Sequence, residues 1–190
     1  MTIERVAVRQ ECEIRAGTGK GPGKLGGYAA VFEQTTDLGW MGKERLARTA
    51  FAVVLADRST DVRALWNHDA QYLLGRQGAG TLRVSTDSRG LEYEVDLPDT
   101  GYARDVRALA ERGDLDGASF AFVPGDWTWD DSRETRTHTS VKRLVDVAPV
   151  TFPAYAGAST EARSTPLAAV RRAQLIRVRH RVRMQERSTA

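Results

Sequence analysis

The sequence has little cysteine and no long apolar run. Cys12 is the only cysteine among 190 residues, which excludes an internal disulfide and a multi-cysteine zinc site. The longest unbroken apolar run covers the seven residues 50–56, whereas a membrane-spanning helix needs about 20. The first residues also lack the apolar segment and small-residue cleavage site of a secretory signal. We therefore expect a cytoplasmic protein with no membrane contact, stabilised by a packed core.

The residues that are present suit one globular domain, because 41% are hydrophobic and 28% are charged. The net charge of +3 is unevenly spread. Residues 163–190 contain eight arginines and one glutamate, which leaves a charge of −4 for residues 1–162. We predict a globular domain over 1–162 and a basic, partly helical tail over 163–190. The tail is either a solvated terminus or a segment that docks on nucleic acid or an acidic protein.

Residues 17–27 contain six glycines, so a phosphate-binding loop has to be considered. Such a loop needs the spacing G-x-x-x-x-G-K-[ST]. That spacing fails at Gly19-Lys20 and at Gly23-Lys24, where Leu25 occupies the place of the hydroxyl residue. The segment is therefore interpreted as a flexible hairpin connection.

Alternation of apolar and polar residues predicts a mainly β fold. The expected strands cover residues 5–15, 28–32, 118–123, 126–129, 133–139 and 141–150, with a hairpin over 81–97. Residues 43–57 are expected to be mostly helical, with a buried strand at 50–56 as the alternative. The clearest helix covers 101–112, with Asp99 as its cap and Gly113 just past its end. One barrel-like antiparallel sheet surrounded by a few helices fits this pattern best.

The chain has only three histidines for acid–base chemistry, His68, His138 and His180. His180 lies in the arginine-rich tail, where no scaffold fixes its position. His68 ends the apolar, strand-like stretch 62–67, so its ring would sit on a rigid frame. The alternative for His68 is an ordinary surface or core histidine.

Ser119 and Asp146 stand out among the polar residues of the expected strands. Ser119 follows Gly117-Ala118 and precedes an apolar strand, but the pattern is one residue short of G-x-S-x-G and no helix follows, which argues against an α/β-hydrolase. The local sequence alone predicts that Ser119 is a small hydroxyl residue packed in a strand. Asp146 interrupts the apolar run 144–150, so it is either exposed on an edge or held by a partner such as a histidine.

Several short motifs occur together in one order along the chain. They are GYAAVF (27–32), a helix-like stretch (44–51), NHD (67–69), LGR (74–76), RGL (89–91), the helix at 101–113, SFAF (119–122) and VTFPAY (150–155). As an ordered set they resemble the prohead maturation proteases of tailed bacteriophages, distant relatives of the herpesvirus assemblins. The resemblance covers about residues 25–158, outside the glycine-rich segment and the basic tail.

The resemblance implies a serine endopeptidase on a β-barrel wrapped by helices. Carried onto the matching positions, Ser119 is the nucleophile, His68 the general base and Asp146 the carboxylate that orients it. In assemblins a second histidine takes the third role, so His138 is the alternative to Asp146. Such a triad needs no metal or cofactor, and none is expected.

The leading hypothesis is a protease packaged inside the immature prohead in the host bacterial cytoplasm. It would cut capsid or scaffold segments and also itself. Related proteases can depend on self-association, so a second copy of the chain is a candidate partner. The main alternative is a non-enzymatic β-barrel module whose tail binds nucleic acid or scaffold, with Trp66, Trp127 and Trp129 as stacking faces or, more simply, as packing residues. A small-molecule esterase is a third option.

Overall fold

The computed structural model describes residues 4–8, 13–15, 23–37 and 42–152. The chain divides into two units, Met1–Ala156 and Gly157–Ala190, and only the first contains described residues. The predicted basic tail over 163–190 lies outside the described residues, so the boundary at 162 stays a prediction.

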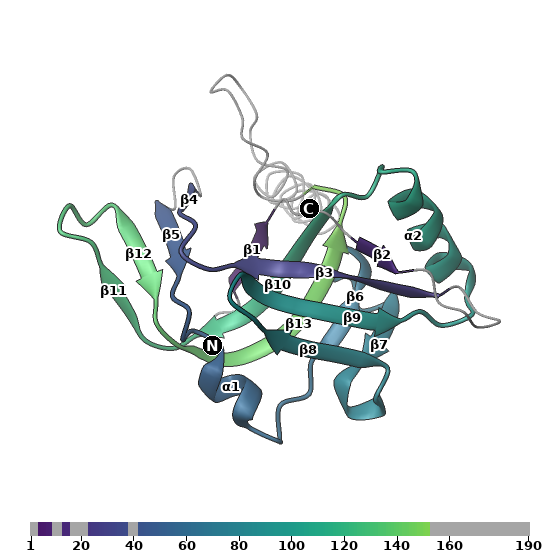
Figure 1. The fold of residues 1–190 in the computed structure, drawn as a ribbon, viewed down its shortest axis with the longest axis horizontal. Coiled ribbons are helices and arrows are strands. Elements are labelled where there is room, and N and C mark those ends of the chain that lie inside the picture. The colour runs from purple at the N-terminus through teal and green to yellow at the C-terminus, as the bar shows by residue number, and fades with distance from the viewer. Residues whose placement is uncertain (1–3, 9–12, 16–22, 38–41, 153–190) are drawn as a thin grey trace, which may run out of the picture. The chain divides into compact units, whose positions relative to one another are not determined.

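A five-stranded sheet in the order β1-β10-β13-β6-β7 positions the candidate residues (Figure 1). Its strands are β1 (Glu4–Val8), β10 (Gly117–Pro124), β13 (Val141–Val150), β6 (Arg63–Leu65) and β7 (Leu73–Arg76). Strand β13 runs antiparallel to β10 and parallel to β6. Almost every residue of β10 is buried, as expected for a central strand that is covered on both faces.

Two four-stranded sheets and short helices complete the described part of the chain (Figure 1). One sheet contains β2 (Glu13–Arg15), β3 (Lys24–Val31), β9 (Gly90–Asp96) and β8 (Leu82–Thr86). The other contains β11 (Trp127–Trp129), β12 (Thr135–His138), β5 (Lys43–Leu46) and β4 (Thr36–Asp37). The helices are α1 (Ala52–Ala56) and α2 (Gly101–Glu111), with 3-10 turns η2 (Trp66–His68) and η3 (Gln77–Ala79).

The mainly β class with few helices is confirmed. Among the described residues, the hydrogen-bonded ladders form three sheets rather than one closed ring. Neither of the two α-helices in this part of the chain has the length and apolarity that crossing a membrane would require.

Several predicted elements match the structure closely. Strands β8 and β9 form the expected hairpin, and β13 covers residues 141–150 as predicted. Strands β2 and β3 pair antiparallel, with Arg15 opposite Lys24, which agrees with a hairpin. Residues 24–27 of the expected connection belong to β3, however, and residues 16–22 lie outside the described residues. Helix α2 is also confirmed, although its cap is Thr100, whose side chain accepts a hydrogen bond from the Ala103 N–H, and not Asp99.

Two predictions about the first third of the chain were wrong. The single strand expected at 5–15 is two strands, because β1 pairs with β10 while β2 pairs with β3. The helix expected over 43–57 is strand β5 followed by the five-residue helix α1. Parallel pairing with β12 holds residues 43–46 extended, so tertiary pairing overrides the helical propensity of Lys, Glu, Arg and Leu.

The main core joins the five-stranded sheet to α1 and to the β3–β9 ladder. The Phe120 ring packs on Phe51 at 5.6 Å and on Phe122 at 5.0 Å between ring centroids. Gly90, in the RGL motif, faces the β3 backbone so closely that a Cβ atom there would lie 1.9 Å from the Ala30 carbonyl oxygen. Only glycine fits at that point of the β3–β9 ladder.

Candidate active site

The ladder of β10 with β13 places Ser119 and Asp146 on the same face of the five-stranded sheet. Ser119 lies opposite Ala148, and Asp146 lies opposite Ala121. Directly opposed residues in an antiparallel pair point to one face, and Ala148 is two residues from Asp146. The alternate residues Phe120 and Val147 oppose each other and belong to the main core. Two small alanines therefore leave room beside the serine and the aspartate.

The histidine comes from the neighbouring strand. Strand β6 ends at Leu65, and the single turn η2 carries His68, close to the strand end that the sequence predicts. The turn is closed by hydrogen bonds from the Asp69 N–H to the Trp66 carbonyl, at 3.0 Å, and from the Trp66 N–H to the Tyr72 carbonyl, at 3.1 Å. His68 thus sits on a defined turn between two paired strands.

The His68 ring bridges the other two side chains. Its Nδ1 lies 2.5 Å from Asp146 Oδ1, and its Nε2 lies 2.7 Å from Ser119 Oγ. A carboxylate only accepts hydrogen bonds, so Nδ1 carries the hydrogen and donates it to Asp146. In the neutral ring Nε2 is then an acceptor, and the Ser119 hydroxyl donates to it. This is the hydrogen-bond order of a Ser–His–Asp triad.

The site is enclosed. Ser119 is 0% exposed and Asp146 is 3% exposed, while 12% of the His68 side chain is exposed. Burying a carboxylate and a hydroxyl is costly unless each finds a hydrogen-bonding partner. The two bonds to His68 supply such partners, so the three polar side chains stabilise one another within the apolar sheet.

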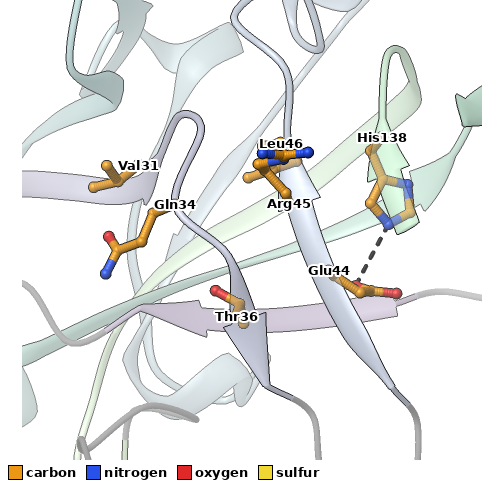
Figure 2. Close-up of a pocket in the computed structure, with 7 residues that line it drawn as sticks. All are labelled: Val31, Gln34, Thr36, Glu44, Arg45, Leu46 and His138. Atoms are coloured by element: carbon orange, nitrogen blue, oxygen red, sulfur yellow. Dashed lines mark ion pairs between the residues drawn. The ribbon is translucent and has the colours of Figure 1, made fainter. Parts of the chain in front are cut away.

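The structure places His138 elsewhere, in the sheet that contains β5 and β12. Its Nε2 lies 3.4 Å from Glu44 Oε2, and its ring packs edge-on against Phe122 at 5.2 Å between centroids. Figure 2 shows this pair among the residues that line a small pocket, together with Val31, Gln34, Thr36, Arg45 and Leu46. The residue that meets His68 is therefore Asp146 and not His138.

Glu44 also contacts the Arg136 guanidinium. Burial raises the pKa of the Glu44 carboxyl, but hydrogen bonding from His138 and Arg136 lowers it by more, so the net pKa is below its ordinary value. Glu44, Arg136 and His138, here called the Glu44 cluster, therefore hold an ionised carboxylate inside the protein.

The remaining candidates do not form a second site. Trp127 and Trp129 are 46% and 52% exposed on the edge strand β11, which pairs with β12, so they lie in a hairpin and not in a core. Trp66 packs against the main core. The Arg136 guanidinium lies 5.6 Å from the Trp127 ring centroid. Among the described residues, no group of three or more His, Cys, Asp and Glu side chains is arranged to hold a metal ion. His180 lies outside them.

Asn67, the residue before His68, is a contact residue of the site that no sequence pattern singled out. Its side chain is hydrogen-bonded to Thr151, directly after β13. The available signal was the NHD motif, which places an amide beside the histidine.

Comparison with known proteins agrees with this geometry. The model of the caudovirus prohead serine protease family matches residues 10–173. The chain belongs to this family. The match is longer than the resemblance at 25–158, because it includes the glycine-rich segment and the start of the basic tail. No curated protein and no solved structure matches the chain significantly.

Proposed function

We propose that this chain is a serine endopeptidase that cuts capsid or scaffold proteins during maturation of a phage prohead. The observation that carries the proposal is the chain of contacts from Ser119 through His68 to Asp146, at 2.7 and 2.5 Å, in a member of the prohead serine protease family. The order His, Ser, Asp along the chain is no obstacle, since triads are defined by geometry.

In the proposed reaction the Ser119 Oγ attacks the carbonyl carbon of the scissile peptide bond, and His68 Nε2 takes the hydroxyl proton. When the C–N bond breaks, the same nitrogen gives this proton to the leaving amine. Water then hydrolyses the acyl-enzyme by the reverse sequence of proton transfers. Asp146 stays ionised throughout, fixes the ring with hydrogen on Nδ1, and stabilises the imidazolium that forms in each step.

The burial of Ser119 bears on how a substrate enters. Attack requires the scissile carbonyl to come within about 3 to 3.5 Å of Oγ, yet the residue is 0% exposed. Cleavage therefore requires a rearrangement that opens this face of the sheet. A slow isolated chain that accelerates on self-association or inside the prohead is the expected behaviour.

Covalent labelling tests the proposal directly. A peptidyl phosphonate should modify the parent protein once, and peptide mapping should find the adduct on Ser119. The matched control is Ser119→Ala, which leaves the rest of the buried strand β10 unchanged and should remain unlabelled. An unmodified parent that instead binds nucleic acid with a steep loss of affinity in salt would favour the non-enzymatic alternative.

Self-cleavage is a separate part of the proposal. The intact mass of the parent after expression should be lower than that of its full sequence, while Ser119→Ala should keep the full mass. Identical masses for the two proteins would exclude self-processing and leave the cleavage of capsid or scaffold substrates standing. Activity on a small ester but on no peptide would instead identify an esterase.

A further inference from the structure

Both polar atoms of the Asn67 side-chain amide are hydrogen-bonded to one residue. Its Oδ1 accepts a hydrogen bond from the Thr151 N–H at 2.8 Å, and its Nδ2 donates to Thr151 Oγ1 at 3.1 Å. Asn67 directly precedes His68, and Thr151 directly follows the last residue of β13, the strand that carries Asp146. The amide thus ties the histidine turn to the aspartate strand.

The register of the sheet explains why these two residues meet. In the parallel β6–β13 ladder Arg63 pairs with Asp146 and Ala64 pairs with Val147. The backbone ladder stops where β6 ends at Leu65. The side-chain oxygen Oδ1 of Asn67 then accepts a hydrogen bond from the first backbone N–H beyond β13, so a side chain extends the pairing by one further bond.

The backbone of the histidine turn needs such support. Asn67 and His68 have φ angles of 55° and 58°, in the left-handed region that non-glycine residues rarely adopt. Such a conformation is strained and persists only where surrounding contacts hold it. A turn without those contacts would relax toward ordinary φ values, and the His68 ring would leave its position between Ser119 and Asp146.

We infer that Asn67 is a positioning residue of the active site: its amide fastens the His68 turn to the end of β13 and so keeps the imidazole aligned with Asp146 and Ser119. The inference rests on the proposed protease function. Asparagine suits the task for two reasons. It tolerates left-handed backbone better than most residues, and its amide supplies one acceptor and one donor.

The test separates the amide from the backbone conformation. Asn67→Gly keeps the left-handed φ without strain but removes both hydrogen bonds. The rate constant for phosphonate labelling of Ser119 should fall about 10- to 100-fold, the loss expected when a catalytic group moves by about 1 Å. On a peptide substrate kcat should fall by a similar factor with KM unchanged, because the substrate-binding groups stay in place.

Two further variants change different parts of the same contact, so their labelling rates can be ranked against that of Asn67→Gly. Asn67→Asp should keep most of the parental labelling rate, because a carboxylate can still accept a hydrogen bond from the Thr151 N–H and can also accept one from the Thr151 hydroxyl. Thr151→Val removes only the Oγ1 bond and should lose less than Asn67→Gly. Asp130→Ala is the structural control. Asp130 Oδ1 accepts hydrogen bonds from the Glu134 N–H at 2.9 Å and the Thr135 N–H at 3.2 Å in the connection between β11 and β12, so the variant removes a comparable contact in another sheet and should leave the labelling rate unchanged.

The outcomes separate this inference from the function on which it rests. A parent labelled at Ser119 and an Asn67→Gly variant labelled at the parental rate would overturn the positioning role and leave the protease. Equal losses in Asn67→Gly and Asn67→Asp would overturn it as well, because the acceptor would then be irrelevant. A loss in Asn67→Gly no larger than that in Asp130→Ala would reduce Asn67 to a structural residue. A parent that is not labelled, either alone or when co-expressed with capsid protein, would instead remove the protease function itself.

Discussion

Two histidines in the described part of the chain each lie beside a buried carboxylate, and their surroundings differ. His68 Nδ1 is 2.5 Å from Asp146, whereas His138 Nε2 is 3.4 Å from Glu44. Asp146 and Glu44 are almost equally buried, at 3% and 4% exposed. Burial beside a carboxylate therefore does not distinguish a catalytic histidine from a structural one.

The difference lies in what else each pair contacts. Glu44 is also bound by Arg136, a permanent cation, so much of its charge is already balanced before His138 is considered. His138 packs against the Phe122 ring, while the second nitrogen of His68 meets the Ser119 hydroxyl. We infer that the Asp146 pair is arranged for proton transfer and the Glu44 cluster for holding β5 against β12.

Removing the hydroxyl should give the largest effect. Ser119→Ala deletes the proposed nucleophile and should lower kcat by a factor on the order of a million, about 8 kcal/mol of activation free energy. The change is small and buried, so the urea midpoint should stay close to that of the parent. Processing of co-expressed capsid protein at the parental rate would show that the nucleophile lies elsewhere.

The same acid-to-amide change at the two carboxylates compares the pairs directly. Asp146→Asn should lower kcat about ten-thousandfold, because an amide no longer fixes the ring with hydrogen on Nδ1. Glu44→Gln should leave kcat within about twofold, because its histidine does not contact Ser119. Peptide-cleavage assays on both purified variants give the ranking, and a larger loss in Glu44→Gln would reverse our assignment of the two pairs.

The sequence indicated four candidates, Ser119, His68, Asp146 and His138, and only the family resemblance grouped the first three into a triad. Asp146 was recognisable because it interrupts an apolar run, and His68 because it ends one. Neither pattern shows that β13 lies between β10 and β6, an order that depends on long-range pairing. The sequence left His138 as the alternative to Asp146. In the structure His68 Nδ1 lies 2.5 Å from Asp146, whereas His138 lies beside Glu44.

Local patterns predicted the fold best where neighbouring residues pair with each other. The β8–β9 hairpin and helix α2 depend on near neighbours, and both were predicted. The strand at residues 43–46 was not predicted. Its partner strand β12 lies about ninety positions away, and no local pattern indicates that pairing. Asn67 was missed for the same reason: its bonds to Thr151 span 84 residues.

Truncating the second histidine should affect stability and not catalysis. The His138 side chain is 1% exposed and packs on Phe122, so His138→Ala should lower the free energy of unfolding by about 2–4 kcal/mol through the cavity it leaves. Under conditions where the variant is folded, kcat should match the parent. Urea denaturation and peptide cleavage measure the two quantities. A fully stable variant without activity would transfer the third catalytic role to His138.

The smallest expected effect is the pH dependence of the Glu44 cluster. The pKa of Glu44 is raised by burial and lowered by more through hydrogen bonding from His138 and Arg136, so the folded-state pKa lies below the unfolded one. The ionised carboxylate then contributes stability that is fully present above the unfolded pKa of about 4.3 and is lost as the pH falls through the folded value. The difference in unfolding free energy between the parent and Glu44→Gln should therefore be constant from pH 7 to about pH 5 and shrink below that. Urea denaturation of both proteins at each pH tests this, and a difference that grows in acid would mean that burial outweighs the two partners.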